Sequence, residues 1–235
     1  MNAAASAEAS AHPEAPDAPA WRAWCASLSW AVPLGAAVLL AGNSMGYYDA
    51  PSLAASGAGL GVTHPPGHPL WVALAAVASL VPVGTVALRI ALLGGVCLAA
   101  TGLAVFHLAH RFVGAVLARG PLPPHAGAVT ALVSMSAAWG ATLGVASMRQ
   151  ATRVEVYALA LALCVGVLAV LCAPSLSRAA RVRLAVVLLG LAGCNHTFIA
   201  LTAMPAALAL IALDLWRDAP RARRFVLAAL PLAAL

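Results

Sequence analysis

The sequence carries little charge and contains no lysine. Only 9% of its 235 residues are charged, whereas an ordinary soluble domain has roughly 25%. By contrast, 63% of the residues are hydrophobic and the mean hydropathy is +0.94. A chain with so few charges cannot cover a globular surface with groups that water solvates. This composition excludes a soluble enzyme, a nucleic-acid-binding module and a disordered scaffold, and it predicts a protein that crosses a membrane several times.

Because lysine is missing, all 13 cationic side chains are arginine, and the net charge is +6. In a membrane protein an excess of arginine indicates which loops face the cytoplasm, since arginine collects in cytoplasmic loops. We therefore expect no nucleic-acid partner. The five cysteines lie in or beside apolar stretches and show neither a CxxC pair nor a Cys/His spacing typical of zinc. They are interpreted as small apolar residues.

A bilayer-spanning helix requires ~20 apolar residues. Apolar segments of about this length occur only after residue 22. Residues 1–22 are predicted to be a disordered cytoplasmic tail, and residues 23–235 a single transmembrane domain that is cut short at its C-terminus. The predicted crossing helices are 26–43, 86–108, 126–147, 155–173, and two short spans that divide 184–216 near Asn195 and His196. The fold class is thus all-α, a polytopic transmembrane helical bundle with about six complete spans plus a truncated one that begins at 225.

The segment 70–81 is apolar but too short to cross a bilayer. The positions of the arginines indicate whether it crosses the membrane or lies at the interface. If 70–81 stays at the interface, ten of the thirteen arginines fall on one face of the membrane. By the positive-inside rule that face is cytoplasmic. We therefore predict an interfacial helix over 70–81, with the polar stretches 43–69, 149–157 and 195–197 together on the outer face.

Acidic residues are scarce, and five of the seven lie in the tail or in a predicted cytoplasmic turn. Only Asp49 and Glu155 remain on the outer face. Ionisable groups near the membrane are costly and usually functional, although each could be an ordinary carboxylate at the headgroup level. Their isolation opposite Arg149 and Arg153 favours a functional role, which makes both acids the candidates for catalytic residues if the protein is an enzyme.

Arg149 and Arg153 are exceptions to the positive-inside pattern, and guanidinium groups match phosphate oxygens in geometry. We expect Arg149 to bind lipid headgroups and Arg153 to serve the site. Arg153 and Tyr157 are four residues apart, which would place them on one helical face. All three are candidate substrate-binding residues.

The run Thr63-His64-Pro65-Pro66-Gly67-His68-Pro69 predicts a stiff, non-helical turn. Two histidines without a third ligand are a weak zinc signal, so no metal and no cofactor is predicted. His64 and His68 are candidate substrate-binding residues instead. Asn195 and His196 either cap two half-helices or contact a substrate, and the residues alone leave both alternatives open.

Three blocks of sequence carry a resemblance. They are Asp49 with 61–70 (GVTHPPGHPL), 82–84 (PVG) and Arg89; 150–159 (QATRVEVYAL); and 190–197 (GLAGCNHT). In this order, over about residues 45–205, they resemble a bacterial membrane family grouped with the protein O-mannosyltransferase-like enzymes, glycosyltransferase family 117.

The resemblance implies a type-C glycosyltransferase fold. Such enzymes take a sugar from a polyprenyl-phosphate carrier at the outer face of the bacterial inner membrane and pass it to an acceptor hydroxyl, often on protein. Asp49 occupies the position of the family's catalytic acid in the first outer loop. Glu155 would order Arg153 or the acceptor, and His64 and His196 would line the pocket. The implied partners are the lipid bilayer, the lipid-linked sugar donor and a protein or glycan acceptor, with the N-terminus in the cytoplasm and the site loops outside.

The sequence departs from the family pattern at Ser52, where the family has a second acid. A non-catalytic membrane subunit is therefore one alternative to the enzyme. A lipid or solute transporter of similar topology is another, in which a broken helix near Asn195 would serve translocation. No inverted repeat is visible in the sequence, which counts against the transporter.

Overall fold

The structure, a computed structural model, describes residues 18–42, 49–63, 65, 67–121 and 125–218. All regular structure in these ranges is helical, so the predicted all-α class is confirmed. The elements are α1 (Ala18–Leu40), α2 (Ala50–Gly59), α3 (Pro69–Ser79), α4 (Val86–Leu117), α5 (Ala126–Thr142), α6 (Val145–Ala151), α7 (Tyr157–Leu171) and α8 (Arg178–Asp218).

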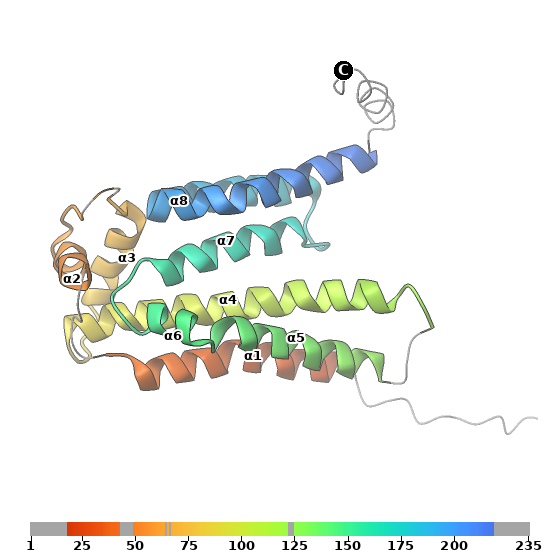
Figure 1. Cartoon of the computed structure of the whole chain (residues 1–235), viewed down its shortest axis with the longest axis horizontal. Coiled ribbons are helices and arrows are strands. Elements are labelled where there is room, and N and C mark those ends of the chain that lie inside the picture. The colour runs from red at the N-terminus through yellow and green to blue at the C-terminus, as the bar shows by residue number, and fades with distance from the viewer. Residues whose placement is uncertain (1–17, 43–48, 64, 66, 122–124, 219–235) are drawn as a thin grey trace, which may run out of the picture.

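The long helices lie side by side, and the short helices α2 and α3 cross one end of the bundle (Figure 1). Helix α4 has 32 residues and packs against α1, α5 and α7. Two of its glycines permit close approach: a Cβ at Gly94 would collide with the carbonyl oxygen of Ala151, and one at Gly102 with that of Ser29. Small residues at such crossings are typical of helices packed inside a membrane.

Helix α8 reverses direction at His196, whose φ of −156° and ψ of 98° are not helical. Ala185 and Ala207 share one buried cluster with Val167 of α7, although in a straight helix they would lie about 33 Å apart. The two arms of α8 accordingly run back along each other (Figure 1). The predicted break of 184–216 near Asn195 and His196 is confirmed.

The predicted number of about six complete spans is not supported. By length and composition, three helices in the described part of the chain could cross a membrane, or four if α5 and α6, bent by 64°, form one span. Helix α7 has 15 residues, short of the ~20 that a straight crossing needs. The helix expected over 126–147 stops at Thr142, because the chain bends at Leu143 and Gly144. The truncated span expected from residue 225 lies outside the described residues.

The segment expected to be an interfacial helix over 70–81 forms α3, a short apolar helix. The turn that follows it is fixed by Arg89 of α4. Its guanidinium donates to the backbone carbonyls of Ser79 at 2.7 Å, Val83 at 2.7 Å and Gly84 at 3.0 Å. These bonds hold the C-terminal end of α3 against the beginning of α4, and thereby set the position of α3 across the end of the bundle.

Candidate functional site

A small pocket lies at the end of the bundle where α2 and α3 cross, α7 begins and α8 bends. It encloses about 240 Å³. The residues that line it come from segments far apart in the sequence: Asp49, Leu53, Pro65, His68, Glu155, Val156, Tyr157, His196 and Phe198. Both outer-face acids predicted from the sequence are among them, together with three of the predicted substrate-binding residues.

The position of His68 follows from the turn before α3. Gly67 and His68 both have positive φ, 104° and 48°, and the Thr63 hydroxyl donates to the Gly67 carbonyl at 2.6 Å. Pro69 then begins the helix, a position where its missing N–H costs nothing. The turn buries the His68 side chain, which is 3% exposed.

The His68 ring bonds to the bend of α8. Its Nδ1 lies 2.5 Å from the carbonyl oxygen of Asn195. A carbonyl can only accept, so Nδ1 carries the proton, and in the neutral ring Nε2 is an acceptor. The contact fixes both the tautomer and the orientation of a ring that lines the pocket.

Asn195 lies behind the pocket and does not line it. Its side chain is 1% exposed, and its Nδ2 donates to the Val156 carbonyl at 3.0 Å. With the bond from His68, Asn195 ties the bend of α8 to the beginnings of both α3 and α7. Its Oδ1 is buried and accepts no hydrogen bond from the residues that the structure describes. These bonds support the structural alternative for Asn195, and its contact with a substrate stays a prediction.

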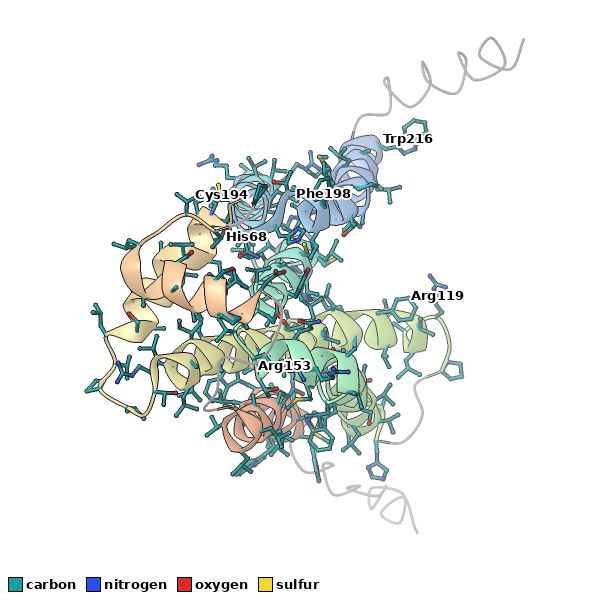
Figure 2. All side chains as sticks on the ribbon, turned by 60° about the vertical axis from the view of Figure 1, so that its left-hand side comes forward. His68, Arg119, Arg153, Cys194, Phe198 and Trp216 are labelled. Carbon is teal, nitrogen blue, oxygen red and sulfur yellow. The ribbon has the colours of Figure 1, made fainter. Side chains whose placement is uncertain are left out.

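His196, by contrast, faces the pocket among other rings. Its ring centroid lies 5.3 Å from that of His68, 5.5 Å from that of Tyr157 and 6.3 Å from that of Phe198. The bend therefore gathers ring side chains from the turn before α3, from α7 and from α8 around one space; Figure 2 labels His68 and Phe198.

Glu155 sits in the irregular link between α6 and α7, and its backbone is held by a residue that the sequence analysis missed. The Trp71 indole N–H donates to the Glu155 carbonyl at 3.1 Å, and Trp71 is 2% exposed. The link is also held through Thr152, whose carbonyl accepts from the Gly42 N–H at 3.2 Å. A buried indole N–H needs an acceptor. That requirement is the one feature of the sequence that could have predicted a hydrogen bond from Trp71.

The two arginines predicted to bind substrate lie outside the pocket. Arg149 and Arg153 are exposed and are not among the residues that line the pocket. The expected helical face shared by Arg153 and Tyr157 is wrong, because residues 152–156 are not helical and α7 begins only at Tyr157. Figure 2 shows Arg153 away from His68 and Phe198.

Two further predictions concern histidine and metal. His64 lies outside the residues that the structure describes. Within the described ranges, no group of three or more His, Cys, Asp or Glu side chains is arranged to hold a metal ion. The arrangement offers instead two carboxylates, two imidazoles and a phenol around one space, which are groups that accept and donate protons.

One family model, described as "Protein O-mannosyl-transferase TMEM260 N-terminal domain", matches residues 49–219, well over half of the chain. The match begins at Asp49 and covers every residue that lines the pocket. No curated protein and no solved structure matches the chain.

Proposed function

Because this chain belongs to the protein O-mannosyl-transferase TMEM260 N-terminal domain family, we propose that it is a membrane glycosyltransferase or the N-terminal part of one. In this proposal it resembles the bacterial enzymes of glycosyltransferase family 117 and lies in the inner membrane, with its N-terminus in the cytoplasm. It moves a sugar from a polyprenyl-phosphate donor to an acceptor hydroxyl on protein or glycan at the outer face. The donor is a substrate, and the proposal requires no cofactor.

One observation carries this proposal. Asp49 and Glu155, which are remote in sequence, line the same pocket. Asp49 is exposed and Glu155 is half-buried. A carboxylate open to solvent can meet an incoming acceptor, while a half-buried one beside it can orient that acceptor. The pocket thus offers two acids in different environments at one end of an apolar bundle.

The reaction needs a group that takes a proton. The acceptor oxygen attacks the anomeric carbon, the bond from that carbon to the phosphate oxygen breaks, and the phosphate leaves with the electron pair. The acceptor proton passes to a carboxylate, as in general-base catalysis. We assign the base to Asp49 and the orientation of the acceptor to Glu155.

The leaving phosphate gains negative charge and needs donors aimed at it. The sequence suggested Arg153, which does not line the pocket. We assign this task to His196 and Tyr157, whose rings line the space. In the neutral His68 ring the N–H already bonds the Asn195 carbonyl, so His68 shapes the pocket and does not donate to the phosphate. Arg149 and Arg153 are exposed, and in this proposal they attract the anionic carrier before it enters.

Replacing the proposed base tests the assignment. In membranes that hold the full chain, Asp49→Asn should lower transfer of mannose from polyprenyl-phosphate mannose to a serine-containing peptide by about 10²–10⁴-fold. Asp17→Asn makes the same chemical change before α1 and should leave transfer unchanged. If Asp49→Asn inserts normally and transfers mannose at the wild-type rate, Asp49 is not the base. If the wild-type protein itself transfers no mannose, the non-catalytic subunit is the better description.

A further inference from the structure

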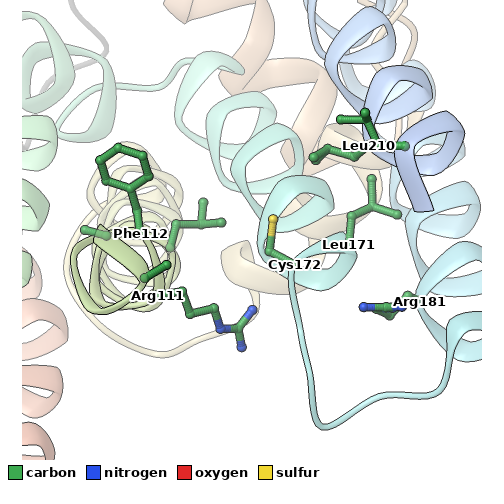
Figure 3. Close-up of a pocket in the computed structure, with 10 residues that line it drawn as sticks. Arg111, Phe112, Leu171, Cys172, Arg181 and Leu210 are labelled. Atoms are coloured by element: carbon green, nitrogen blue, oxygen red, sulfur yellow. The ribbon is translucent and has the colours of Figure 1, made fainter. Parts of the chain in front are cut away.

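A second, larger pocket lies at the opposite end of the bundle between α4, α7 and α8 (Figure 3). It encloses about 730 Å³, and its lining includes Arg111, Phe112, Leu171, Cys172, Arg181 and Leu210. Ligand pockets in proteins have volumes of about 300–1,000 Å³, so this space is large enough for part of a ligand of substantial size.

The two pockets are well separated. Helix α7 begins at Tyr157, which lines the candidate site, and ends at Leu171, which lines the second pocket. Its length of 15 residues corresponds to about 22 Å. A ligand in the second pocket would therefore touch none of the groups assigned to sugar transfer.

The wall of the second pocket is mainly apolar. Besides leucines from α4, α7 and α8 it presents Phe112, which is 72% exposed. Apolar side chains that line an open hollow on an apolar bundle suit a hydrocarbon chain, because such a chain packs against them and carries no polar group that would need a partner there.

Two guanidinium groups stand at this apolar wall, Arg111 from α4 and Arg181 from the first turn of α8. Figure 3 shows them on either side of the end of α7 near Cys172. Arg111 donates from Nη1 to the Ala169 carbonyl at 3.3 Å, which uses one of its five N–H groups. Two such forks across one space complement a phosphate group in charge and geometry.

The position along the helices agrees with a headgroup. Arg181 lies at the beginning of α8 and Cys172 directly follows α7, so the charged part of the pocket is at the helix ends and the apolar part extends inward. The chain that follows α8 carries Arg221, Arg223 and Arg224, whose charge has the wrong sign to complement Arg111 and Arg181.

We propose that this pocket binds an anionic membrane phospholipid. Its phosphate lies between Arg111 and Arg181, and an acyl chain lies along Phe112, Leu171 and Leu210. The lipid is a bound component of the fold at the arginine-rich end, the end that the sequence assigns to the cytoplasm, and it takes no part in sugar transfer.

Lipid binding to the purified full chain in mild detergent, followed by native mass spectrometry, tests this. Phosphatidylglycerol should bind more tightly than phosphatidylcholine with the same acyl chains. Arg111→Gln and Arg181→Gln should each weaken phosphatidylglycerol binding by roughly tenfold, because each removes a charge-assisted contact to phosphate. Phosphatidylcholine binding should weaken less, because its choline cation offsets the attraction between its phosphate and the guanidinium groups. The control is Arg119→Gln, which makes the same charge change at an exposed residue outside the lining.

A variant without charge change keeps the test valid if an arginine variant does not fold. Leu210→Trp should fill part of the pocket and weaken binding of both lipids. Equal affinity of the wild type for the two lipids would overturn the proposal, as would an Arg119→Gln loss as large as those of the pocket variants. Full competition by glycerophosphoglycerol, which has the headgroup without acyl chains, would also overturn it, since the pocket would then bind a free phosphate group and not a lipid.

Discussion

Asn195 shows how a single buried amide organises the candidate site without lining it. Its carbonyl accepts from the His68 ring and its side-chain amide donates to Val156. In each bond the acceptor is a backbone carbonyl, that of Asn195 in the first and that of Val156 in the second. The two bonds therefore fix where the chain segments lie. The pocket-lining rings of His68 and His196 therefore depend on a residue that lies behind the pocket.

Removing the Asn195 side chain should destabilise the fold. Asn195→Ala removes the side-chain bond to the Val156 carbonyl, which keeps its bond from the Ala160 N–H at 3.2 Å, so the cost is about 0.5–1.5 kcal/mol. The expected result is a lower midpoint of thermal unfolding in detergent. Thr197→Ala provides the control, because that side chain is exposed and bonds only one turn back, to Gly193 at 3.2 Å. Equal effects of the two variants would show that the Asn195 bond contributes nothing of its own.

Trp71 acts on the site through the backbone of Glu155. Trp71→Phe keeps most of the buried apolar surface and removes the N–H that bonds the Glu155 carbonyl, so the link before α7 loses a fixed point. If the proposed function holds, kcat should fall about tenfold, corresponding to one lost hydrogen bond of ~1.4 kcal/mol, with a smaller change in KM. Trp30→Phe, at a partly exposed position of α1, should leave both constants unchanged; a loss of the same size there would point to a general effect on folding.

At the scale of helices, close approach depends on glycine at particular places in α4. A methyl group at Gly94 would meet the Ala151 carbonyl, so the end of α6 would have to move away from α4. Gly114 lies on the same helix with nothing within 4 Å of where a Cβ would be. Replacing each glycine by alanine therefore distinguishes the effect of helix packing on stability from the effect of helix propensity.

Gly94→Ala should lower the midpoint of thermal unfolding, because overpacking of a tight contact costs about 1–3 kcal/mol. Gly114→Ala should leave it unchanged or raise it, since alanine favours a helix over glycine by up to ~1 kcal/mol. Unfolding curves of the two purified variants in one detergent make the comparison. A loss of stability at Gly114 as large as at Gly94 would contradict this account of the contact.

The helices were predictable where polar residues interrupt an apolar run. The pair Asn195–His196 revealed the bend of α8, and the run of prolines before α3 revealed its beginning. The break at Leu143 and Gly144 was not predictable, because the apolar residues continue through it and a helix surrounded by apolar groups has no distinct polar face from which its limits can be read. Arg153 was misplaced for a different reason: a helical period was assumed over residues 152–156, where there is no helix.

The candidate pocket was predictable in part because acids are so rare. With Asp49 and Glu155 isolated on one predicted face, their meeting followed from topology alone. The rings around them, the hidden role of Asn195 and the contact of Trp71 required coordinates, since they depend on backbone carbonyls that a sequence pattern does not show.

At the scale of the whole molecule, the two ends of the bundle differ in chemistry. The candidate site and the α8 bend occupy one end, and Arg111, Arg181 and the loop after α7 occupy the other (Figure 1, Figure 3). If the molecule crosses a membrane, these ends face opposite aqueous phases, and the positive-inside rule assigns the arginine end to the cytoplasm.

Single cysteines should report these two sides. In a chain whose five native cysteines are replaced, Ser52→Cys on α2 should react in intact cells with a membrane-impermeant maleimide. Ser177→Cys, directly before α8, should react only after the membrane is permeabilised. Both serines are exposed, so access is set by the membrane and not by burial. Reaction of both cysteines from the same side would contradict the two-ended arrangement.

The reversal of α8 also bears on how the protein is made. A ribosome delivers the first arm, from Arg178, before the second, and the polar pair Asn195–His196 emerges between them. The first arm packs on the second through Ala185 and Ala207, and that contact cannot form until the second arm has been synthesised. We therefore expect the two arms to leave the translocon together as a helical hairpin, with insertion waiting until the second arm has been synthesised.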